Sequence, residues 1–490
     1  MKAFFAGAAL VCAGSAVAAP VLAPPAPLAA DVKQFVRIPA GKIAIAHVRV
    51  IDGTGASPAE DRTVLVDGAT IAAVQDSNVA VPAAYRVIDA TGETLIPGIV
   101  GMHNHMFYIA RPNLTPAGHA DEPLVVPQMT FSAPRLYLAN GVTTMRTTGS
   151  VEPYTDLNVK QQIDAGQMPG PHINVTGPYL EGPGSHFIQM HQLRDPYDAR
   201  RTVAFWADQG VGSFKAYMNI TRAELKAAVD EAHKRGLKVT GHLCSVTYPE
   251  AAAIGIDNLE HGFFVNTQLD PGKKPDVCPA AGGTPTLVAM TPGSAEAKAL
   301  IALLVARHVA VTSTLPVFEM PLHAPLNPRA MAVLTPQARQ DYLYIRNLVA
   351  THASSPIAAK LQRAYDNDVK LEHAFADAGG LLIAGPDPTG NGGVIPGFGD
   401  QREIELLVQD AGFTPVEAIR IATLNGATFM GLQDRIGSIS AGKIADLVLI
   451  KGNPAANIAD IEKVDTVFKD GVGYDSHKLL DSVEGAYGRY

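Results

Sequence analysis

Two histidines one residue apart, His103 and His105, are the first residues of this 490-residue chain whose spacing points to chemistry. They lie in the stretch 96–107, which opens with a proline–glycine pair and runs through a short apolar segment typical of a strand. Residues i and i+2 of a strand point to the same face, so the two imidazoles can reach one point. Imidazole is a common ligand for zinc and related metals. The pair therefore indicates a metal site, although two histidines at a strand end can also be incidental polar residues.

Two segments carry a family resemblance. Residues 97–105, Pro-Gly-Ile-Val-Gly-Met-His-Asn-His, resemble the first-strand signature of the amidohydrolase superfamily, metal-dependent hydrolases built on a (β/α)₈ barrel. Residues 442–448, Gly-Lys-Ile-Ala-Asp-Leu-Val, resemble the C-terminal strand of the same family. The resemblance extends from about residue 43 to residue 474. It implies an α/β protein with a (β/α)₈ TIM-like barrel and a small composite β-sandwich domain built from both termini.

The resemblance also assigns a binuclear metal site at the carboxyl ends of the barrel strands, where the active sites of such barrels lie. Six residues match the family's ligands in order along the chain: His103, His105, Lys215, His242, His261 and Asp387. Taken alone, His242 and His261 would each be better explained as core histidines, and only the family pattern makes them ligands. Asp387 stands between two prolines, where most relatives have Gly-Thr-Asp. The aspartate is therefore kept, but its loop departs from the pattern.

Lys215 differs from the other five residues because an ammonium group cannot bind a cation. Burial lowers the pKa of a lysine and frees its amine. In binuclear relatives this lysine takes up carbon dioxide, and the resulting carbamate bridges the metals. The resemblance thus implies two divalent ions, with zinc as the expected metal, and carboxylated Lys215 as their bridging ligand. The alternative is a surface or salt-bridged lysine, which an interior-facing strand position disfavours.

The pair Lys215 and Tyr217 resembles the Lys-x-Tyr strand of secreted Xaa-Pro dipeptidases and N-acyl-amino-acid hydrolases, the imidazolonepropionase-like part of the superfamily. It implies cleavage of an amide or peptide C–N bond, in a dipeptide or an N-acyl amino acid, by a hydroxide that bridges the metals. Asp387 is the expected catalytic residue, because it can accept the proton of the attacking water and pass it to the leaving amine. Tyr217 and His186 are candidate substrate-binding residues, with packing as the alternative for Tyr217. Arg146 is expected in an exposed or structural salt bridge.

Two other functions stay open. The same site could act on a different electrophile, as a lactonase or a phosphotriesterase. The chain could also be a non-catalytic, amidohydrolase-like binding protein that kept the barrel and lost the chemistry. Retention of all six ligand residues favours the enzyme.

The elements that must position these residues alternate between strand and helix from residue 96 to residue 435, the pattern of a parallel barrel. The second to eighth barrel strands are expected at residues 142–147, 172–176, 213–218, 237–243, 257–260, 309–315 and 381–385. After the fourth strand, Thr221 and Glu224 form a capping box that begins a helix. The long connections 263–308 and 316–378 follow strand ends and are expected to shape a site.

Short strands rich in Val and Ile flank the barrel on both sides. They are expected at residues 43–52, 63–66, 69–74 and 86–89, and again at 437–440, 445–450 and 465–469. We therefore expect one β-sandwich in two parts, 41–95 and 436–490, with the hydrolase barrel over 96–435 between them.

The N-terminus has a positively charged start, a short apolar run and an Ala16-Val17-Ala18 site, which together indicate a secretory signal peptide over residues 1–18. Residues 19–40 are then expected to be a flexible lead-in rich in Pro and Ala. Export would place the protein in the periplasm or outside the cell. In that oxidising environment we expect a disulfide between Cys244 and Cys278, with two separate buried thiols as the alternative.

The overall composition limits the partners. A hydrophobic content of 47% and a charged content of 18% are typical of a folded globular protein. The net charge of −8, without a basic stripe, argues against nucleic-acid binding. No apolar stretch reaches the roughly 20 residues that a membrane span needs. The expected partner is a small-molecule or peptide substrate, and a homo-oligomer is compatible with the sequence.

Overall fold

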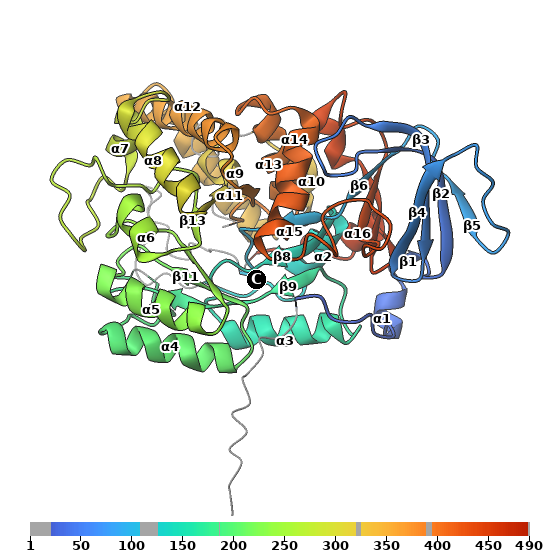
Figure 1. Ribbon diagram of the computed structural model, residues 1–490, viewed down its shortest axis with the longest axis horizontal. Helices are drawn as coiled ribbons and strands as arrows, with labels where there is room; N and C mark the ends of the chain where they lie inside the picture. Colours follow the sequence, from blue (N-terminus) through green and yellow to red (C-terminus); the bar gives the residue numbers. More distant parts are fainter. Residues whose placement is uncertain (1–20, 108–125, 186, 320–324, 389–393, 489–490) are drawn as a thin grey trace, which may run out of the picture.

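The computed structural model describes residues 21–107, 126–185, 187–319, 325–388 and 394–488. Figure 1 shows a barrel wrapped by helices and, at one end of it, a β domain. In that domain the blue N-terminal strands lie beside the red C-terminal segment, so the two ends of the chain share one unit. The expected class, an α/β barrel with a composite β domain, is confirmed.

The barrel strands follow one another in chain order and run parallel. They are β7 (Ile99–Gly101), β8 (Val142–Arg146), β9 (His172–Asn174) continued by β10 (Thr176–Leu180), β11 (Ser213–Ala216), β12 (Lys238–Gly241), β13 (Asn258–Glu260), β14 (Ala310–Ser313) and β15 (Leu382–Ala384). Only Val175 separates β9 from β10, and its carbonyl accepts from the Gly212 amide at 2.7 Å, so the two segments act as one strand. The Met102 amide donates to the Ala384 carbonyl at 2.8 Å and thereby joins the first strand to the last.

Helices follow the strands and cover the outside of the barrel (Figure 1). The principal ones are α2 (Ser132–Ala139), α3 (Pro153–Asp164), α4 (Pro196–Asp208), α5 (Arg222–Lys234), α6 (Tyr248–Ile254), α8 (Ala295–Ala306), α13 (Phe398–Gln409) and α14 (Pro415–Arg420). The expected capping box begins α5: the Thr221 side chain accepts from the Glu224 amide, and the Glu224 carboxylate accepts from the Thr221 amide. Among the described residues, no helix is both long and apolar enough to cross a membrane.

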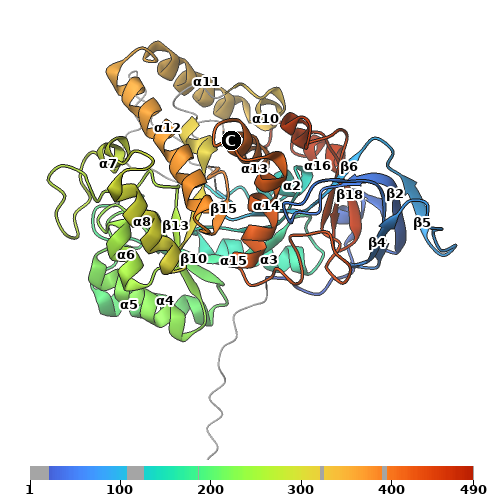
Figure 2. The same cartoon turned by 45° about the horizontal axis from the view of Figure 1, so that its top comes forward.

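The two long connections expected after strands six and seven are largely helical. The first carries α7 (Thr284–Ala289) and α8, and the second carries α9 (Leu315–Glu319), α10 (Pro328–Val333), α11 (Pro336–Thr351) and α12 (Pro356–Asp377). Figure 2 shows α11 and α12 as a pair of helices at the upper edge of the molecule. Phe318 of α9 stacks on Phe264 with ring centroids 3.6 Å apart and lies 5.8 Å from the His261 ring. Both connections therefore reach the mouth of the barrel.

The β domain contains nine strands in one hydrogen-bonded sheet, ordered β1-β18-β17-β16-β6-β2-β3-β4, with β5 paired to β2. They are β1 (Val36–Ile38), β2 (Lys42–Val50), β3 (Ala59–Asp67), β4 (Thr70–Asp76), β5 (Arg86–Asp89), β6 (Thr94–Pro97), β16 (Leu447–Ile450), β17 (Val464–Lys469) and β18 (Val472–Asp475). The start of β4 bonds back to the segment before β16, where the Ile71 amide donates to Lys443 and the Ala445 amide donates to Ala69, both at 2.8 Å. The sheet thus curls around its own apolar core, which includes Val64, Leu95, Leu447 and Phe468.

The expectation of a flexible lead-in over residues 19–40 is wrong for residues 21–40. Leu22 is buried in a small apolar cluster, Val32 of α1 (Ala30–Lys33) and Phe35 are buried in the main core, and β1 pairs with β18. The composition suggested disorder, but these apolar side chains gain more from burial than the segment loses in ordering. The signal peptide expected over residues 1–18 lies outside the described residues.

Two boundaries of the C-terminal part also differ from expectation. Residues 437–440 form no strand, because Gly437 adopts a positive φ of 83° that interrupts extended backbone. The segment after β18 packs on the barrel as well as on the β domain: α16 (Ser476–Asp481) contacts α2 in addition to β17 and β18, and Tyr487 is fully buried in the main core.

The expected disulfide between Cys244 and Cys278 is confirmed, with the two Cα atoms 4.8 Å apart. It ties the loop after β12 to the long connection before α7, next to the barrel mouth. Replacing Cys278 by Ser should free this connection and cost about 2–4 kcal/mol of stability. We expect limited proteolysis to cut residues 268–283 faster in Cys278→Ser than in the wild type, with Thr291→Ser, at an exposed position of the same connection, as the control. Equal cleavage rates would contradict this structural role.

Candidate metal centre

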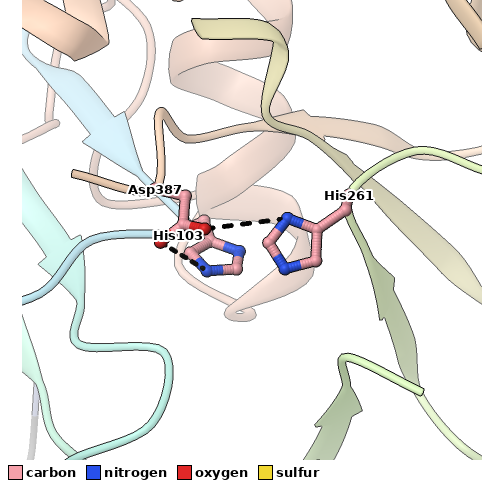
Figure 3. Close-up of side chains that lie close together, drawn as sticks. All are labelled: His103, His261 and Asp387. Atoms are coloured by element: carbon pink, nitrogen blue, oxygen red, sulfur yellow. Dashed lines mark ion pairs between the residues drawn. The ribbon is translucent and has the colours of Figure 1, made fainter. Parts of the chain in front are cut away.

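The mouth of the barrel brings together residues from the first, sixth and eighth strands. In Figure 3, dashed lines mark ion pairs from the Asp387 carboxylate to the rings of His103 and His261. Asp387 Oδ1 lies 3.5 Å from His103 Nε2, and its Oδ2 lies 3.9 Å from His261 Nδ1. One ligand atom from each of the three residues falls within 4.8 Å of the others, a spacing that a single cation can bridge.

The remaining three expected ligands lie around this group. His105 Nε2 is 3.0 Å from Asp387 Oδ1, and Lys215 Nζ is 3.2 Å from His103 Nε2. The His242 ring lies 4.4 Å from the His261 ring, measured between centroids. All six residues that the sequence singled out therefore converge at one place.

Three of the histidines are held from behind by the protein. His103 Nδ1 donates to Glu260 Oε2 at 2.7 Å, and His105 Nδ1 donates to the Thr147 carbonyl at 3.1 Å. His261 Nδ1 lies 3.0 Å from the Thr314 hydroxyl, while its buried Nε2 has no hydrogen-bond partner within the described part of the chain. A metal-binding imidazole usually contacts a protein partner through one ring nitrogen and turns the other to the metal. Here the Nε2 atoms of His103 and His105 face Lys215 and Asp387, which are themselves candidate ligands. The donor set therefore fits a divalent metal.

Glu260 is the residue behind the centre that sequence reasoning missed. Its Oε1 accepts from Arg146 Nη2 at 2.7 Å, and Thr240 donates to the same oxygen. The Arg146 side chain is buried, and its Nε donates to the Met102 carbonyl at 2.9 Å. The expected structural salt bridge of Arg146 thus exists inside the barrel. The signal for Glu260 in the sequence was its charge, at a position next to His261 on a short strand of the barrel interior.

Burial sets the protonation state of the imidazoles. It lowers the pKa of His103 to about 4 and that of His242 to about 3, with the charge of Lys215 acting in the same direction. Burial also lowers the pKa of His105 and of His261. At neutral pH these rings are neutral, which is the form that binds metals.

The lysine and the aspartate are shifted in the same enclosed space. Burial lowers the pKa of Lys215 to about 8, although Glu260 and Asp387 oppose the shift. Burial also acts to raise the pKa of Asp387, but His103 and His105 outweigh it and hold the pKa well below its usual value. The site therefore combines an amine that is easily freed of its proton with a carboxylate that stays ionised.

Close backbone approach is part of the geometry. A side chain at Gly385 would place its Cβ 2.1 Å from the His103 amide nitrogen, so only glycine allows the eighth strand to pass the first there. His261 and Asp387 have positive φ angles of 68° and 52°. Non-glycine residues rarely adopt this conformation, and such strain is concentrated at functional sites.

An apolar wall adjoins four of the six residues, His105, Lys215, His242 and Asp387, and encloses a cavity of about 60 Å³. Its described lining beyond the candidate ligands consists of Phe107, Val126, Val151, Tyr179, Phe187, Met190 and Tyr217. Tyr217 packs 4.9 Å from the His242 ring and 4.8 Å from the Tyr179 ring, and burial raises the pKa of its hydroxyl well above the usual value. Phe107 lies two residues after His105 and shares its face. This i, i+2 spacing could have identified Phe107 as a lining residue from the sequence. His186 lies outside the described residues.

The closed barrel with a metal-capable cluster at the carboxyl ends of its strands defines a class of barrel proteins built to hold divalent ions. Residues 94–472 match the model of the amidohydrolase family. The chain belongs to that family.

Comparison with known proteins gives short matches in sequence and long ones in structure. The chain is 37% identical over 83 residues to imidazolonepropionase of Deinococcus radiodurans, covering 17% of this chain and 20% of that protein. It is 32% identical over 101 residues to ochratoxinase of Aspergillus niger, covering 20% of each. The chain thus spans about a fifth of the length of these curated relatives.

Solved structures match almost throughout. A putative prolidase from Bifidobacterium longum aligns with a TM-score of 0.64 at 24% identity, over 91% of this chain and 99% of that one. A Xaa-Pro dipeptidase crystallised with methionine in its active site aligns with a TM-score of 0.66 at 20% identity, over 89% and 100%. At these identities the likeness shows the fold.

Replacing Glu260 by Gln should weaken metal binding without removing a candidate ligand. The change takes away the charge that orients His103, and such outer partners are worth about 10–100-fold in affinity. We expect chelator competition to show this loss while the circular dichroism spectrum stays native. Glu60→Gln, in the surface ion pair with Arg49, is the matched control. Unchanged metal affinity in Glu260→Gln would remove Glu260 from the metal centre.

Proposed function

We propose that the protein is a metal-dependent hydrolase that cleaves an amide or peptide C–N bond. The observation that carries this proposal is the convergence of six residues at the carboxyl ends of five barrel strands, with the Nδ1 atoms of three histidines held by the protein. His103, His105, Lys215, His242, His261 and Asp387 would hold two divalent ions, with zinc as the proposed metal. Names of the relatives, an imidazolonepropionase and a prolidase among them, agree with C–N bond hydrolysis.

Two bound ions would lower the pKa of a bound water molecule and polarise the substrate carbonyl. Asp387 is placed to handle the proton, because its carboxylate lies at the centre of the group and is ionised at neutral pH. It would accept the proton of the attacking water and deliver it to the nitrogen of the leaving amine. His105 Nε2 lies 3.0 Å from the carboxylate, and both groups are candidate ligands of the same ions.

The proposed substrate is a dipeptide or an N-acyl amino acid. The cavity beside the ligands is walled mainly by aromatic and aliphatic side chains, so the group bound there should be apolar. The Tyr217 hydroxyl keeps its proton because of its raised pKa, and it can donate a hydrogen bond to a substrate oxygen. These features support an apolar acyl group or side chain next to the scissile bond.

We also propose that the protein acts after export. The disulfide between Cys244 and Cys278 supports this view, because such bonds form and persist in oxidising compartments. The N-terminal leader composition points the same way.

Asp387→Asn should lower kcat by roughly 10²–10⁴-fold, because the variant cannot carry the proton. The assay is a panel of dipeptides and N-acyl amino acids with apolar and charged groups, beside a lactone and a phosphotriester. We expect the wild type to hydrolyse the amides with apolar groups faster than the other compounds of the panel. Asp377→Asn, on an exposed side chain, is the matched control.

The panel also decides between functions. Turnover of lactone or phosphotriester with none of any amide would contradict the amide proposal. No turnover at all by protein that holds two metals would favour a binding protein.

The pKa of Lys215 predicts a pH dependence for carbamate formation, which needs the neutral amine. With a pKa of about 8, roughly a tenth of the amines are neutral at pH 7 and roughly nine-tenths at pH 9. At the same concentration of dissolved ¹³CO₂, metal-free protein given zinc should therefore gain a carbamate NMR signal several times faster at pH 9 than at pH 7. A signal that persists in Lys215→Ala would contradict the assignment, whereas Lys226→Ala should leave it unchanged.

A further inference from the structure

A second group of metal-binding side chains lies away from the barrel mouth. His172 begins β9, at the amino end of the third barrel strand and thus at the opposite end from the candidate metal centre. Asp446 directly precedes β16, and Asp470 lies in the turn between β17 and β18. The group therefore spans the junction between the barrel and the β domain.

His172 and Asp446 are buried and Asp470 is partly buried, and facing atoms of the first two lack hydrogen-bond partners among the described residues. Relative exposure of the side chains is 1% for His172, 2% for Asp446 and 11% for Asp470. Both ring nitrogens of His172 and Oδ2 of Asp446 have no hydrogen-bond partner within the described ranges. Buried polar atoms without partners are rare and costly, so something that this group can bind is expected between them.

The spacing suits a divalent cation. His172 Nε2 lies 3.3 Å from Asp470 Oδ1 and 3.8 Å from Asp446 Oδ2. Ligands at about 2.0–2.1 Å in a tetrahedral site lie roughly 3.3 Å apart, so a small contraction would complete the arrangement. One imidazole with two carboxylates is a ligand set that zinc and related ions accept.

The surroundings hold the carboxylates in place. Asp446 Oδ1 accepts from the Asp470 amide at 2.8 Å, which leaves Oδ2 to face His172. Lys469 Nζ lies 3.4 Å from Oδ2 of Asp470, which leaves Oδ1 for the group.

A small cavity of about 40 Å³ adjoins His172 and Asp470 and is covered by residues 23–26 and 28 of the N-terminal segment. That volume can hold a water molecule, which would fill the fourth ligand position.

We propose that His172, Asp446 and Asp470 bind a divalent cation of the zinc type, separate from the centre at the barrel mouth, which ties β9 to the β domain. The role is structural: one ion joins the barrel to two turns of the β domain that are far apart in the sequence. The site does not depend on the proposed hydrolysis.

The test is the zinc content of three proteins after metal removal, reconstitution with zinc and dialysis. The wild type should hold one zinc per chain more than Asp470→Asn, and Asp470→Asn should keep the wild type's hydrolysis rates to within about twofold. Asp67→Asn, the same change at an exposed position of the β domain, should match the wild type. Equal zinc in Asp470→Asn and the wild type would overturn the proposal.

A second pair of variants decides the matter if Asp470→Asn does not fold. One variant disables the centre at the barrel mouth by three changes, His103→Ala, His105→Ala and His261→Ala. It should still hold one zinc, and X-ray absorption should show that this zinc is bound by nitrogen and oxygen atoms. Adding His172→Ala to it should remove that zinc. A triple variant without zinc would overturn the proposal, whatever the activity of the wild type.

Discussion

The carboxylate of Glu260 is completely buried between the strands of the barrel, where an unpaired charge would cost several kcal/mol. Its two oxygens are satisfied by Arg146 from β8, Thr240 from β12 and His103 from β7. These contacts tie β13 to β8, to β12 and to the segment after β7 in the observed register. The contact with Glu260 also fixes which nitrogen of His103 faces the candidate metal centre. The hydrogen bonds of Glu260 therefore stabilise the barrel interior and set the geometry of the site.

Exclusion of water from this space also sets the chemistry of the residues in front of Glu260. Burial keeps the imidazoles neutral and brings the pKa of Lys215 to about 8, while the neighbouring histidines keep Asp387 ionised. In a low-dielectric pocket these effects are larger than they would be in water. The connections that carry Phe318 and the disulfide of Cys244 supply that enclosure. The apolar wall on the other side leaves room for a substrate group of matching character.

The sequence predicted those features of the fold and site that leave a pattern in neighbouring residues, and it missed those that depend on contacts between distant residues. Strand periodicity located all eight barrel strands, and the family pattern ordered the six candidate ligands, because both are local patterns along the chain. The contact of Glu260 with Arg146 joins residues 114 positions apart, and no local pattern reports which strands face each other. The prediction of a flexible N-terminal segment was wrong for a related reason. Its Pro and Ala content suggested disorder, but Leu22 and Phe35 find apolar surface that exists only in the folded barrel.

The most direct test of the account is anomalous X-ray diffraction at the zinc edge from crystals of the wild-type protein. The account predicts two peaks at the barrel mouth, about 3.5–4 Å apart as in other two-metal sites, within bonding distance of the six converging side chains. A single peak would contradict the binuclear centre. No peak at the mouth of zinc-reconstituted protein would contradict the assignment of these residues as a metal site.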